Sequence, residues 1–394
     1  MAIILFDDNA HQSLLPLTYT RPVADLRVGI FTIAEKWAKY LDIGYSFYTE
    51  DYLRAKFPQN IEERNLFING SFCPDEELIA AIKQLHGNEA LKYGDKLVAV
   101  KLNEWDAAKF DPKDSFDKTV ILEHNPVVIN YPEDIFKNNA AELRKDFAFI
   151  TKGRTSAVIS STNTIIGTDF FAEEGAVAEC CTFNTTNGPI YLAADTEVWE
   201  GTHIRGAFAL CEHSQVKMGA KIYGGTTIGP YCRVGGEISN AVIWGYSSKG
   251  HEGFLGNSVL GEWCNIGADT NNSNLKNNYA EVKLWDYATR RFRKTGLQFC
   301  GLIMADHAKC GINTMFNTGT VVGVSANVFG AGFPRNFVPD FAWGGAQGFE
   351  VYSLKKAFET AVLVYERRNR VFNEQEQDIL KQVFELTEEF RGVL

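Results

Sequence analysis

The feature that most constrains the fold is a branched aliphatic residue that recurs every six positions in the middle of the chain. Eight such residues fall in one register without a break: Leu192, Val198, Ile204, Leu210, Val216, Ile222, Ile228 and Val234. After an interruption the pattern returns twice, at Phe254, Leu260 and Ile266 and then at Phe316, Val322 and Val328.

A period of six fits neither of the two common secondary-structure patterns. An amphipathic helix needs apolar residues at i, i+3, i+4 and i+7, and a half-buried strand needs strict alternation. One aliphatic residue in six instead indicates one inward side chain on each of three sides of a coil, and stacked coils bury a continuous aliphatic column. We therefore predict a parallel β-helix of hexapeptide repeats for residues 156–345.

The flanking regions predict different structures. In residues 1–155 short apolar segments alternate with helix-like segments, which indicates an α/β domain with a parallel sheet. In residues 346–394 apolar residues recur at helical spacing, and Asn373 with Glu376 predicts the start of a second helix. We expect this C-terminal helical hairpin to pack on the end coil or on a neighbouring subunit. The polar stretch 269–295 leaves the repeat, and we expect a loop excursion there.

Composition excludes several classes of protein. The net charge is −10 and no run of Lys and Arg is long enough for a nucleic-acid patch, so we expect no nucleic-acid partner. The eight cysteines include no C-x-x-C pair, which argues against a zinc ribbon or a disulfide framework, and we predict no metal site there. No apolar run approaches the roughly 20 residues of a membrane span, and the opening MAIILF lacks the basic start of a signal peptide. We expect a cytoplasmic protein without membrane insertion.

A distinctive motif lies at Gly250-His251-Glu252-Gly253-Phe254-Leu255-Gly256, followed by the segment from Asn265 to Asn274. These residues resemble the acetyltransferase domain of the bifunctional N-acetylglucosamine-1-phosphate uridylyltransferase / glucosamine-1-phosphate acetyltransferase family. The likeness is good over residues 224–323, and the whole chain looks like the Bacteroidetes-type variant, with a reduced nucleotidyltransferase-like N-terminal domain. The resemblance implies a left-handed coil, acetyl-CoA as co-substrate, an amino-sugar phosphate as acceptor and a role in sugar-nucleotide or cell-envelope biosynthesis. Flat prism faces also suit a homotrimer.

The resemblance assigns the catalytic role to His251. A sugar amine is largely protonated at neutral pH and cannot attack a thioester until it loses a proton. An imidazole, with an ordinary pKa near 6.5, can accept that proton at working pH. We therefore expect His251 to be the general base.

Four residues are expected to bind the acceptor sugar phosphate. Arg233 matches the family's phosphate-binding arginine, and a guanidinium suits phosphate because it donates two parallel hydrogen bonds. Asn265 and Asn274 match asparagines that contact the sugar or the donor. Two positions depart from the family: its lysine before the histidine is absent, so Lys249 is the expected substitute, and its tyrosine after the histidine is Phe254.

Arg335 and Lys309 are the expected contacts for the phosphates of CoA, together with a basic cluster at residues 290–294. His307 lies close by in the sequence, and we expect it at a corner of the coil with its ring in solvent.

The N-terminal domain gives a mixed signal. Leu15-Pro16-Leu17-Thr18 resembles part of the sugar nucleotidyltransferase signature, in which a Gly-rich loop cradles the triphosphate. Here the loop contains Asp7 and Asp8 instead of glycine, and the family's metal-binding Asp falls at Ser71, which cannot hold Mg²⁺ in the same way. Arg21, Arg27 and Lys36 remain as possible phosphate contacts. Nucleotidyl transfer with Mg²⁺, binding without turnover and a structural remnant all stay open.

Two other classes compete with an acetyltransferase. A zinc hydro-lyase on the same scaffold needs three closely placed His ligands, and His203, His213, His251 and His307 are too scattered in the sequence. A non-catalytic sugar-nucleotide-binding protein is the other alternative, and it is supported by the eroded N-terminal signature.

Overall fold

The computed structural model describes residues 2–116 and 118–392. It forms two compact units, one made of residues up to Leu26 with Phe31–Asp134, the other of Arg27–Ile30 with Ile135–Leu394.

The first unit contains a six-stranded sheet with strand order β2-β1-β3-β5-β4-β6. The pairs β1–β2, β1–β3 and β4–β6 are parallel, whereas β5 is antiparallel to β3 and β4. The predicted parallel sheet is therefore confirmed around the fully buried β1, and the sheet is mixed beyond β3. The strands are β1 (Ala2–Phe6), β2 (Tyr45–Tyr48), β3 (Arg64–Asn69), β4 (Glu89–Tyr93), β5 (Lys96–Asn103) and β6 (Lys118–Ile121).

Three helices of this unit begin at a residue whose side chain caps them, namely Thr32, Asp75 and Asn103. The Thr32 side chain accepts a hydrogen bond from the N–H of Glu35, and the Glu35 carboxylate accepts one from the N–H of Thr32. The Asp75 side chain caps the helix after β3 by accepting a hydrogen bond from the N–H of Leu78. The helices are α1 (Ala10–Ser13), α2 (Ile33–Leu41), α3 (Glu76–Gln84) and α4 (Glu104–Ala107), with short 3₁₀ turns at Val23–Asp25 and Asp51–Leu53.

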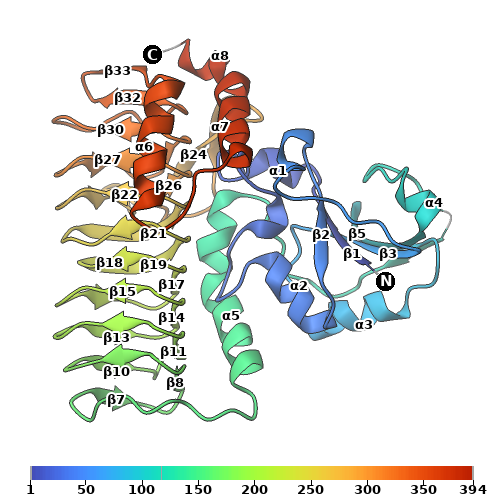
Figure 1. Ribbon diagram of the computed structural model, residues 1–394, viewed down its shortest axis with the longest axis horizontal. Coiled ribbons are helices and arrows are strands. Elements are labelled where there is room, and N and C mark those ends of the chain that lie inside the picture. Colours follow the sequence, from blue (N-terminus) through green and yellow to red (C-terminus); the bar gives the residue numbers. More distant parts are fainter. Residues whose placement is uncertain (1, 117, 393–394) are drawn as a thin grey trace. The chain divides into compact units, whose positions relative to one another are not determined.

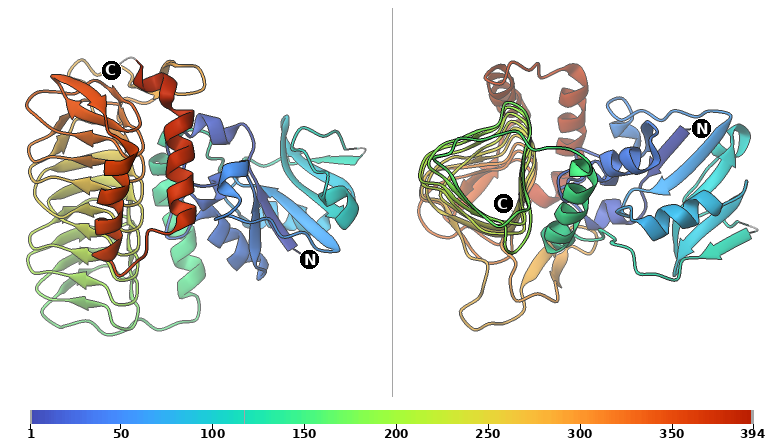
Figure 2. Two further views of the ribbon diagram at one scale, coloured as in Figure 1. Left: turned by 45° about the horizontal axis from the view of Figure 1, so that its top comes forward. Right: turned by 90° about the horizontal axis from the view of Figure 1, so that it is seen from below.

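The second unit is a parallel β-helix with a triangular cross-section, beside which helix α5 (Pro132–Thr151) runs (Figure 1, Figure 2). Three ladders of parallel strands, called faces A, B and C here, form its sides. Face A contains β7 (Thr164–Ile166), β10 (Thr182–Asn184), β13 (His203–Arg205), β16 (Lys221–Ile222), the first halves of β19 (Glu237–Ile243) and β21 (Phe254–Leu260), β23 (Asn271–Asn272) and β28 (Met315–Phe316). Face B contains β8 (Phe170–Ala172), β11 (Ile190–Leu192), β14 (Phe208–Leu210), β17 (Thr226–Ile228), the second halves of β19 and β21, β26 (Leu302–Met304), β29 (Thr320–Val322) and β31 (Phe337–Val338). Face C contains β9 (Val177–Ala178), β12 (Glu197–Val198), β15 (Gln215–Val216), β18 (Arg233–Val234), β20 (Ser248–Lys249), β22 (Asn265–Ile266), β27 (Lys309–Cys310), β30 (Asn327–Val328) and β32 (Ala342–Gly345).

The aliphatic column predicted from the repeat forms the core of this unit. All eight residues of the uninterrupted series, Leu192 to Val234, are at most 2% exposed. Burying such a side chain stabilises the fold by about 1.5–3 kcal/mol, so the series alone accounts for much of the driving force of the coil. The left-handed sense of the coil stays a prediction.

The register expected at Phe254 is wrong by one position. Leu255 points into the core, paired with Ile238, and Phe254 is half-buried. Leu260, the next residue of the aliphatic column, follows Leu255 by five positions instead of six, and Asn257 turns the corner between them with a positive φ of 48°. Asn240 does the same between Ile238 and Ile243 in the preceding coil, with φ of 48°, and asparagine tolerates this left-handed conformation better than most residues.

The excursion from the coil begins later than expected, because Asn271 and Asn272 still pair with Met315 and Phe316. It contains an antiparallel hairpin of β24 (Lys283–Asp286) and β25 (Arg291–Lys294).

The C-terminal segment is helical after the short strand β33 (Gly348–Val351), as predicted. Its helices are α6 (Leu354–Glu366), α7 (Glu374–Leu386) and α8 (Glu388–Arg391), and Asn373 caps α7. The C-terminal end of α6 packs on the corner between faces B and C, where the ring of Tyr365 stacks on that of Trp263 with ring centres 3.8 Å apart. It therefore covers coils of its own chain, and His307 lies beneath it with 7% exposure, which contradicts the expected solvent-facing ring.

None of the helices within the described residues is long and apolar enough to cross a membrane.

Candidate active site

Three of the predicted site residues share one outward-facing column on face C. In successive strands Arg233 pairs with Ser248, Ser248 with Asn265, and Asn265 with Lys309. Neighbouring strands lie about 4.8 Å apart, so this column covers about 14 Å of the face. The coil thus brings together residues that lie on four successive strands of face C, from β18 to β27.

His251 lies at the corner between faces C and A, directly after β20. Its side chain is exposed, and among the described residues no hydrogen bond to its imidazole ring occurs. The ring is therefore accessible to a substrate lying along face C.

Arg233 belongs to a group of three cations that we call the face C cation cluster: Lys217, Arg233 and Arg368. Burial and the neighbouring Arg368 lower the pKa of Arg233. The pKa of Lys217 is lowered mainly by burial and next by the positive charge of Arg233, and Arg368 lowers it further. Neighbouring positive charges repel each other and so lower each other's pKa. A bound anion would relieve this repulsion, so such a group of cations favours anion binding.

The side chains of this cluster are held in place by neutral partners. Arg233 Nη1 donates to the carbonyl oxygens of His213 at 2.8 Å and Cys232 at 2.9 Å. Lys217 Nζ lies 3.6 Å from the centre of the Trp199 ring and donates to Gln215 Oε1 at 3.0 Å. These contacts fix the two groups, and the Glu197 carboxylate is the nearby acidic group that favours the charge of both.

Two members of this cluster were not predicted. Lys217 follows the repeat residue Val216 and lies one coil before Gly235, so its place next to Arg233 could have been found from the coil spacing. Arg368 follows α6 and comes to face C through the packing of the C-terminal helices, for which the sequence of the β-helix holds no signal.

Lys249 does not lie on the surface where a substrate contact was expected. It takes an inward position of face C, paired with Val234, and is 2% exposed. Its Nζ donates to the main-chain oxygen of His251 at 2.6 Å, and burial lowers its pKa to about 8. The predicted direct contact of Lys249 with the substrate is wrong in this structure.

The two predicted asparagines have different surroundings. Asn265 is exposed in the face C column. Asn274 lies at the corner between faces A and B, where its Nδ2 donates to Asn257 Oδ1 at 2.8 Å. That contact stacks Asn274 on the asparagine of the preceding coil, so its observed role is to form the corner, away from the Arg233 column.

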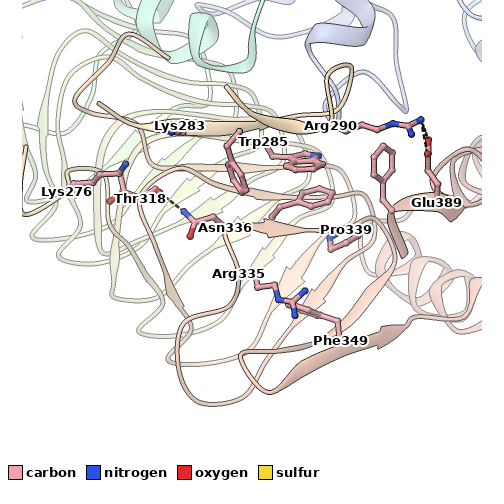
Figure 3. A pocket seen from close by; sticks show the side chains of 13 residues that line it. Lys276, Lys283, Trp285, Arg290, Thr318, Arg335, Asn336, Pro339, Phe349 and Glu389 are labelled. Carbon is pink, nitrogen blue, oxygen red and sulfur yellow. Dashed lines mark hydrogen bonds and ion pairs between the residues drawn. The ribbon is translucent and has the colours of Figure 1, made fainter. Parts of the chain in front are cut away.

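A second candidate site is an open cleft of about 930 Å³ beside the excursion hairpin (Figure 3). Its wall is aromatic: Trp285 stacks on Phe337 at 4.3 Å, and Phe292 and Phe390 contact these rings from the edge. The indole N–H of Trp285 is buried without a partner among the described residues. The cleft also has basic residues: Lys276, Lys283, Arg290 and Arg335.

The structure separates the two residues predicted to bind CoA phosphates. Arg335 is exposed in the cleft, where Arg290 of the expected basic cluster also lies, paired with Glu389 at 2.8 Å. Lys309 lies on face C beside α6, where its Nζ donates to the His307 carbonyl at 2.8 Å and burial lowers its pKa to about 8. Only one of the two can serve a ligand in the cleft.

In the N-terminal unit, the loop after β1 is held by its own carboxylates. Asp7 accepts hydrogen bonds from the N–H of Val23 at 2.9 Å and from Thr49 Oγ1 at 2.5 Å. Asp8 accepts one from Asn69 Nδ2 at 3.0 Å and lies 3.3 Å from Lys96 Nζ. This is the carboxyl edge of parallel strands β1 and β3, where open α/β sheets bind ligands.

The expected phosphate and metal contacts of this domain do not gather there. Arg21 is 4% exposed and paired with Asp25, Lys36 is 1% exposed, and Arg27 belongs to the other compact unit. Ser71 is fully buried and donates to Asn69 Oδ1 at 2.7 Å. In the described part of the chain, no three His, Cys, Asp or Glu side chains cluster as metal ligands would. These residues do not fit a Mg²⁺ site of the family's kind.

The fold and these two sites define a protein that joins an α/β domain to a parallel β-helix with an exposed histidine and a cluster of three cations on one face. In a comparison with known protein families, residues 3–155 match the model described as sugar nucleotidyl transferase.

The chain is also similar to the bifunctional protein GlmU of Methanocaldococcus jannaschii, with 31% identity over 87 residues. That stretch covers 22% of this chain and 21% of the relative. Among solved structures, the UDP-N-acetylglucosamine acyltransferase of Arabidopsis overlaps 52% of this chain and 77% of its own at 17% identity, with a TM-score of 0.24. The enzyme of that name from Campylobacter jejuni overlaps 59% and 83% at 11% identity, with a TM-score of 0.17. Overlays this poor say nothing about the reaction of this chain.

Proposed function

We propose that the β-helix transfers an acetyl group from acetyl-CoA to the amine of an amino-sugar phosphate of the glucosamine-1-phosphate kind. One observation carries the proposal: an exposed His251 stands at the edge of the face that holds the face C cation cluster. A base next to an anion site is the arrangement that an amino-sugar phosphate needs, because its amine must lose a proton while its phosphate is held.

The reaction needs no covalent enzyme intermediate. His251 takes a proton from the sugar ammonium group, the freed amine attacks the thioester carbon, and the C–S bond breaks. The attacking nitrogen then loses a second proton to give the amide, and the departing CoA thiolate takes up one proton to become the thiol. The negative charge that develops on the carbonyl oxygen is stabilised by main-chain N–H donors of the coil.

Arg233, Lys217 and Arg368 would bind the sugar phosphate, and the exposed Asn265, two strands beyond Arg233 on face C, would contact the sugar. Arg233 supplies paired N–H donors, which suit phosphate oxygens. The group as a whole supplies positive charge that the acceptor's dianion requires.

The donor fits the aromatic cleft. Rings such as Trp285 and Phe292 suit an adenine base, and Arg335 and Lys283 suit its phosphates. The excursion that forms this cleft leaves the coil after the corner between faces A and B, whereas His251 lies at the corner between C and A. We infer that a homotrimer, packed through flat faces, completes each site with residues of two copies.

The test is thiol release from acetyl-CoA in the presence of glucosamine-1-phosphate. His251→Ala should lower kcat by about 10²–10⁴-fold. His203→Ala is the matched control, since His203 is also exposed but lies on face A, and its activity should equal that of the wild type. Absence of thiol release with every amino-sugar phosphate would refute the assigned reaction and favour a non-catalytic binding protein.

Nucleotidyl transfer in the N-terminal domain is a second candidate, favoured by the family match over residues 3–155. Against it stand the carboxylates of Asp7 and Asp8 at the strand edge and the buried Ser71. Pyrophosphate release from UTP and N-acetylglucosamine-1-phosphate, with and without Mg²⁺, decides between turnover and binding alone. Titration with the UDP-sugar then separates a binding domain from a structural remnant.

A further inference from the structure

Lys249 is a charged residue at a position that the fold reserves for apolar side chains. The same inward column of face C holds Val216, Val234, Ile266 and Val328 in other coils, each at most 4% exposed. Lys249 is 2% exposed in this column. Burial of an ammonium group is unfavourable unless it gains specific partners, and an aliphatic residue here would continue the core.

The ammonium group has a specific partner at the corner that carries the proposed base. Lys249 Nζ donates to the main-chain oxygen of His251 at 2.6 Å. That carbonyl is thereby drawn towards the core, and the imidazole of the same residue lies outside. A single hydrogen bond thus links the interior of the coil to the backbone of the proposed base.

The neighbouring coil is shaped to accept this arrangement. Gly236 has a positive φ of 72°, and a Cβ there would lie 2.9 Å from Lys249 Nζ and 2.7 Å from the His251 oxygen. The absence of a side chain therefore leaves the space that both groups occupy. Glu252, Asp269, Cys310 and Lys221 are the titratable groups that act on Lys249, with the first three favouring its charge.

We propose that Lys249 is a positioning residue: its buried ammonium group holds the His251 carbonyl inward and so fixes the corner that presents the imidazole to the substrate. This role rests on the proposed acetyl transfer. It explains why an ammonium group replaces an aliphatic side chain in this one coil, and it predicts that loss of the group lowers turnover without unfolding the protein.

The test uses Lys249→Met in the full chain, with Ile266→Met, in the next coil of the same column, as the packing control. Methionine fills a similar volume but donates no hydrogen bond. We expect kcat to fall by about 10–100-fold at nearly constant KM, as misplacement of a reacting group does. Tm should be unchanged or higher, because an apolar replacement of a buried charge is often neutral or stabilising. Lys249→Gln, which keeps an N–H donor, should retain more of kcat than Lys249→Met.

Amide hydrogen exchange of the 249–254 peptide separates this proposal from the proposed reaction. If wild type transfers no acetyl group, the reaction is refuted, and faster exchange of this peptide in Lys249→Met but not in Ile266→Met still supports the positioning role. Equal exchange in all three proteins overturns it. A kcat loss in Lys249→Met that Ile266→Met matches, or that follows a fall in Tm, also overturns it.

Discussion

Arg370 donates a hydrogen bond to the hydroxyl of Tyr246 at 2.8 Å, across 124 residues of sequence. Its guanidinium also lies over the rings of Tyr246 and Tyr231, at 5.6 and 5.8 Å from their centres. Both tyrosines turn the corner between faces B and C with positive φ, and they stack on each other at 5.0 Å. The linker between α6 and α7 is therefore anchored to the coil next to face C.

This anchor places Arg368 near Arg233 and Lys217, and the first prediction concerns its role. Arg368→Ala should raise the KM for the amino-sugar phosphate by about 10–100-fold, since a charge-assisted hydrogen bond is worth about 1.5–3 kcal/mol, and leave kcat nearly unchanged. Steady-state kinetics at fixed acetyl-CoA measure this. Arg367→Ala removes an exposed neighbouring cation and should change neither constant. Equal effects of the two substitutions on KM would contradict a specific phosphate contact of Arg368, because the net charge of the protein would then explain both.

Asn139 of α5 joins three groups of its unit. Its Oδ1 accepts from the N–H of Gly29 at 2.7 Å, and its Nδ2 donates to the Gly225 carbonyl at 2.9 Å and Thr227 Oγ1 at 3.0 Å. Asn139→Ala leaves buried polar groups without partners, at about 1–3 kcal/mol each. We expect a loss of about 2–4 kcal/mol in the free energy of unfolding, measured by denaturant titration. Lys137→Ala, on the exposed side of the same helix, should cost far less.

Asp340 should make stability depend on pH. It is fully buried, accepts hydrogen bonds from the Val324 N–H at 2.7 Å and from Tyr287 at 2.8 Å, and burial raises its pKa to about 6. Because the folded state holds this proton more tightly than the unfolded chain, the contribution of Asp340 is most favourable below about pH 4. It is lost as pH rises from about 4 to 6, by roughly 3 kcal/mol in total.

Asp340→Asn removes this titration. Unfolding free energies of the variant, measured at pH 4.5 and 7, should differ by less than those of the wild type. If the difference between the two pH values is the same in both proteins, other carboxyl groups control the acid range.

How far the sequence predicts such features depends on whether they repeat. The aliphatic column was predictable because each coil places a residue such as Val216 or Val234 at the same point, and burial selects the same chemistry each time. The Phe254 register failed because the left-handed Asn257 shortens the corner between Leu255 and Leu260 to five positions, and this spacing is visible only when neighbouring coils are aligned.

The candidate site shows the same contrast between residues that a sequence pattern indicates and residues that only tertiary packing brings together. The resemblance to a known family predicted Arg233 and Asn265 as site residues, and the coil places both on one face. Lys249 was predicted as a substrate contact in place of the family's missing lysine, and its burial had no signal in the sequence because a lysine is rarely buried. Arg368 and the aromatic cleft arise from packing between distant segments, which no local pattern in the sequence records.

The last prediction tests whether the cleft holds the nucleotide end of the donor. Arg335 is exposed there and can meet phosphate groups of CoA, whereas the acetyl-pantetheine part carries none. Arg335→Gln should therefore raise the KM for acetyl-CoA by about tenfold, the effect of losing a charge-assisted contact. Turnover of acetyl-pantetheine, which lacks the nucleotide, should be the same in Arg335→Gln and wild type. Arg205→Gln, which alters an exposed arginine of face A, serves as the control for net charge. An equal loss with both donors would place Arg335 outside the nucleotide site and assign the cleft to another ligand, because the substitution would then act on a step that both donors share.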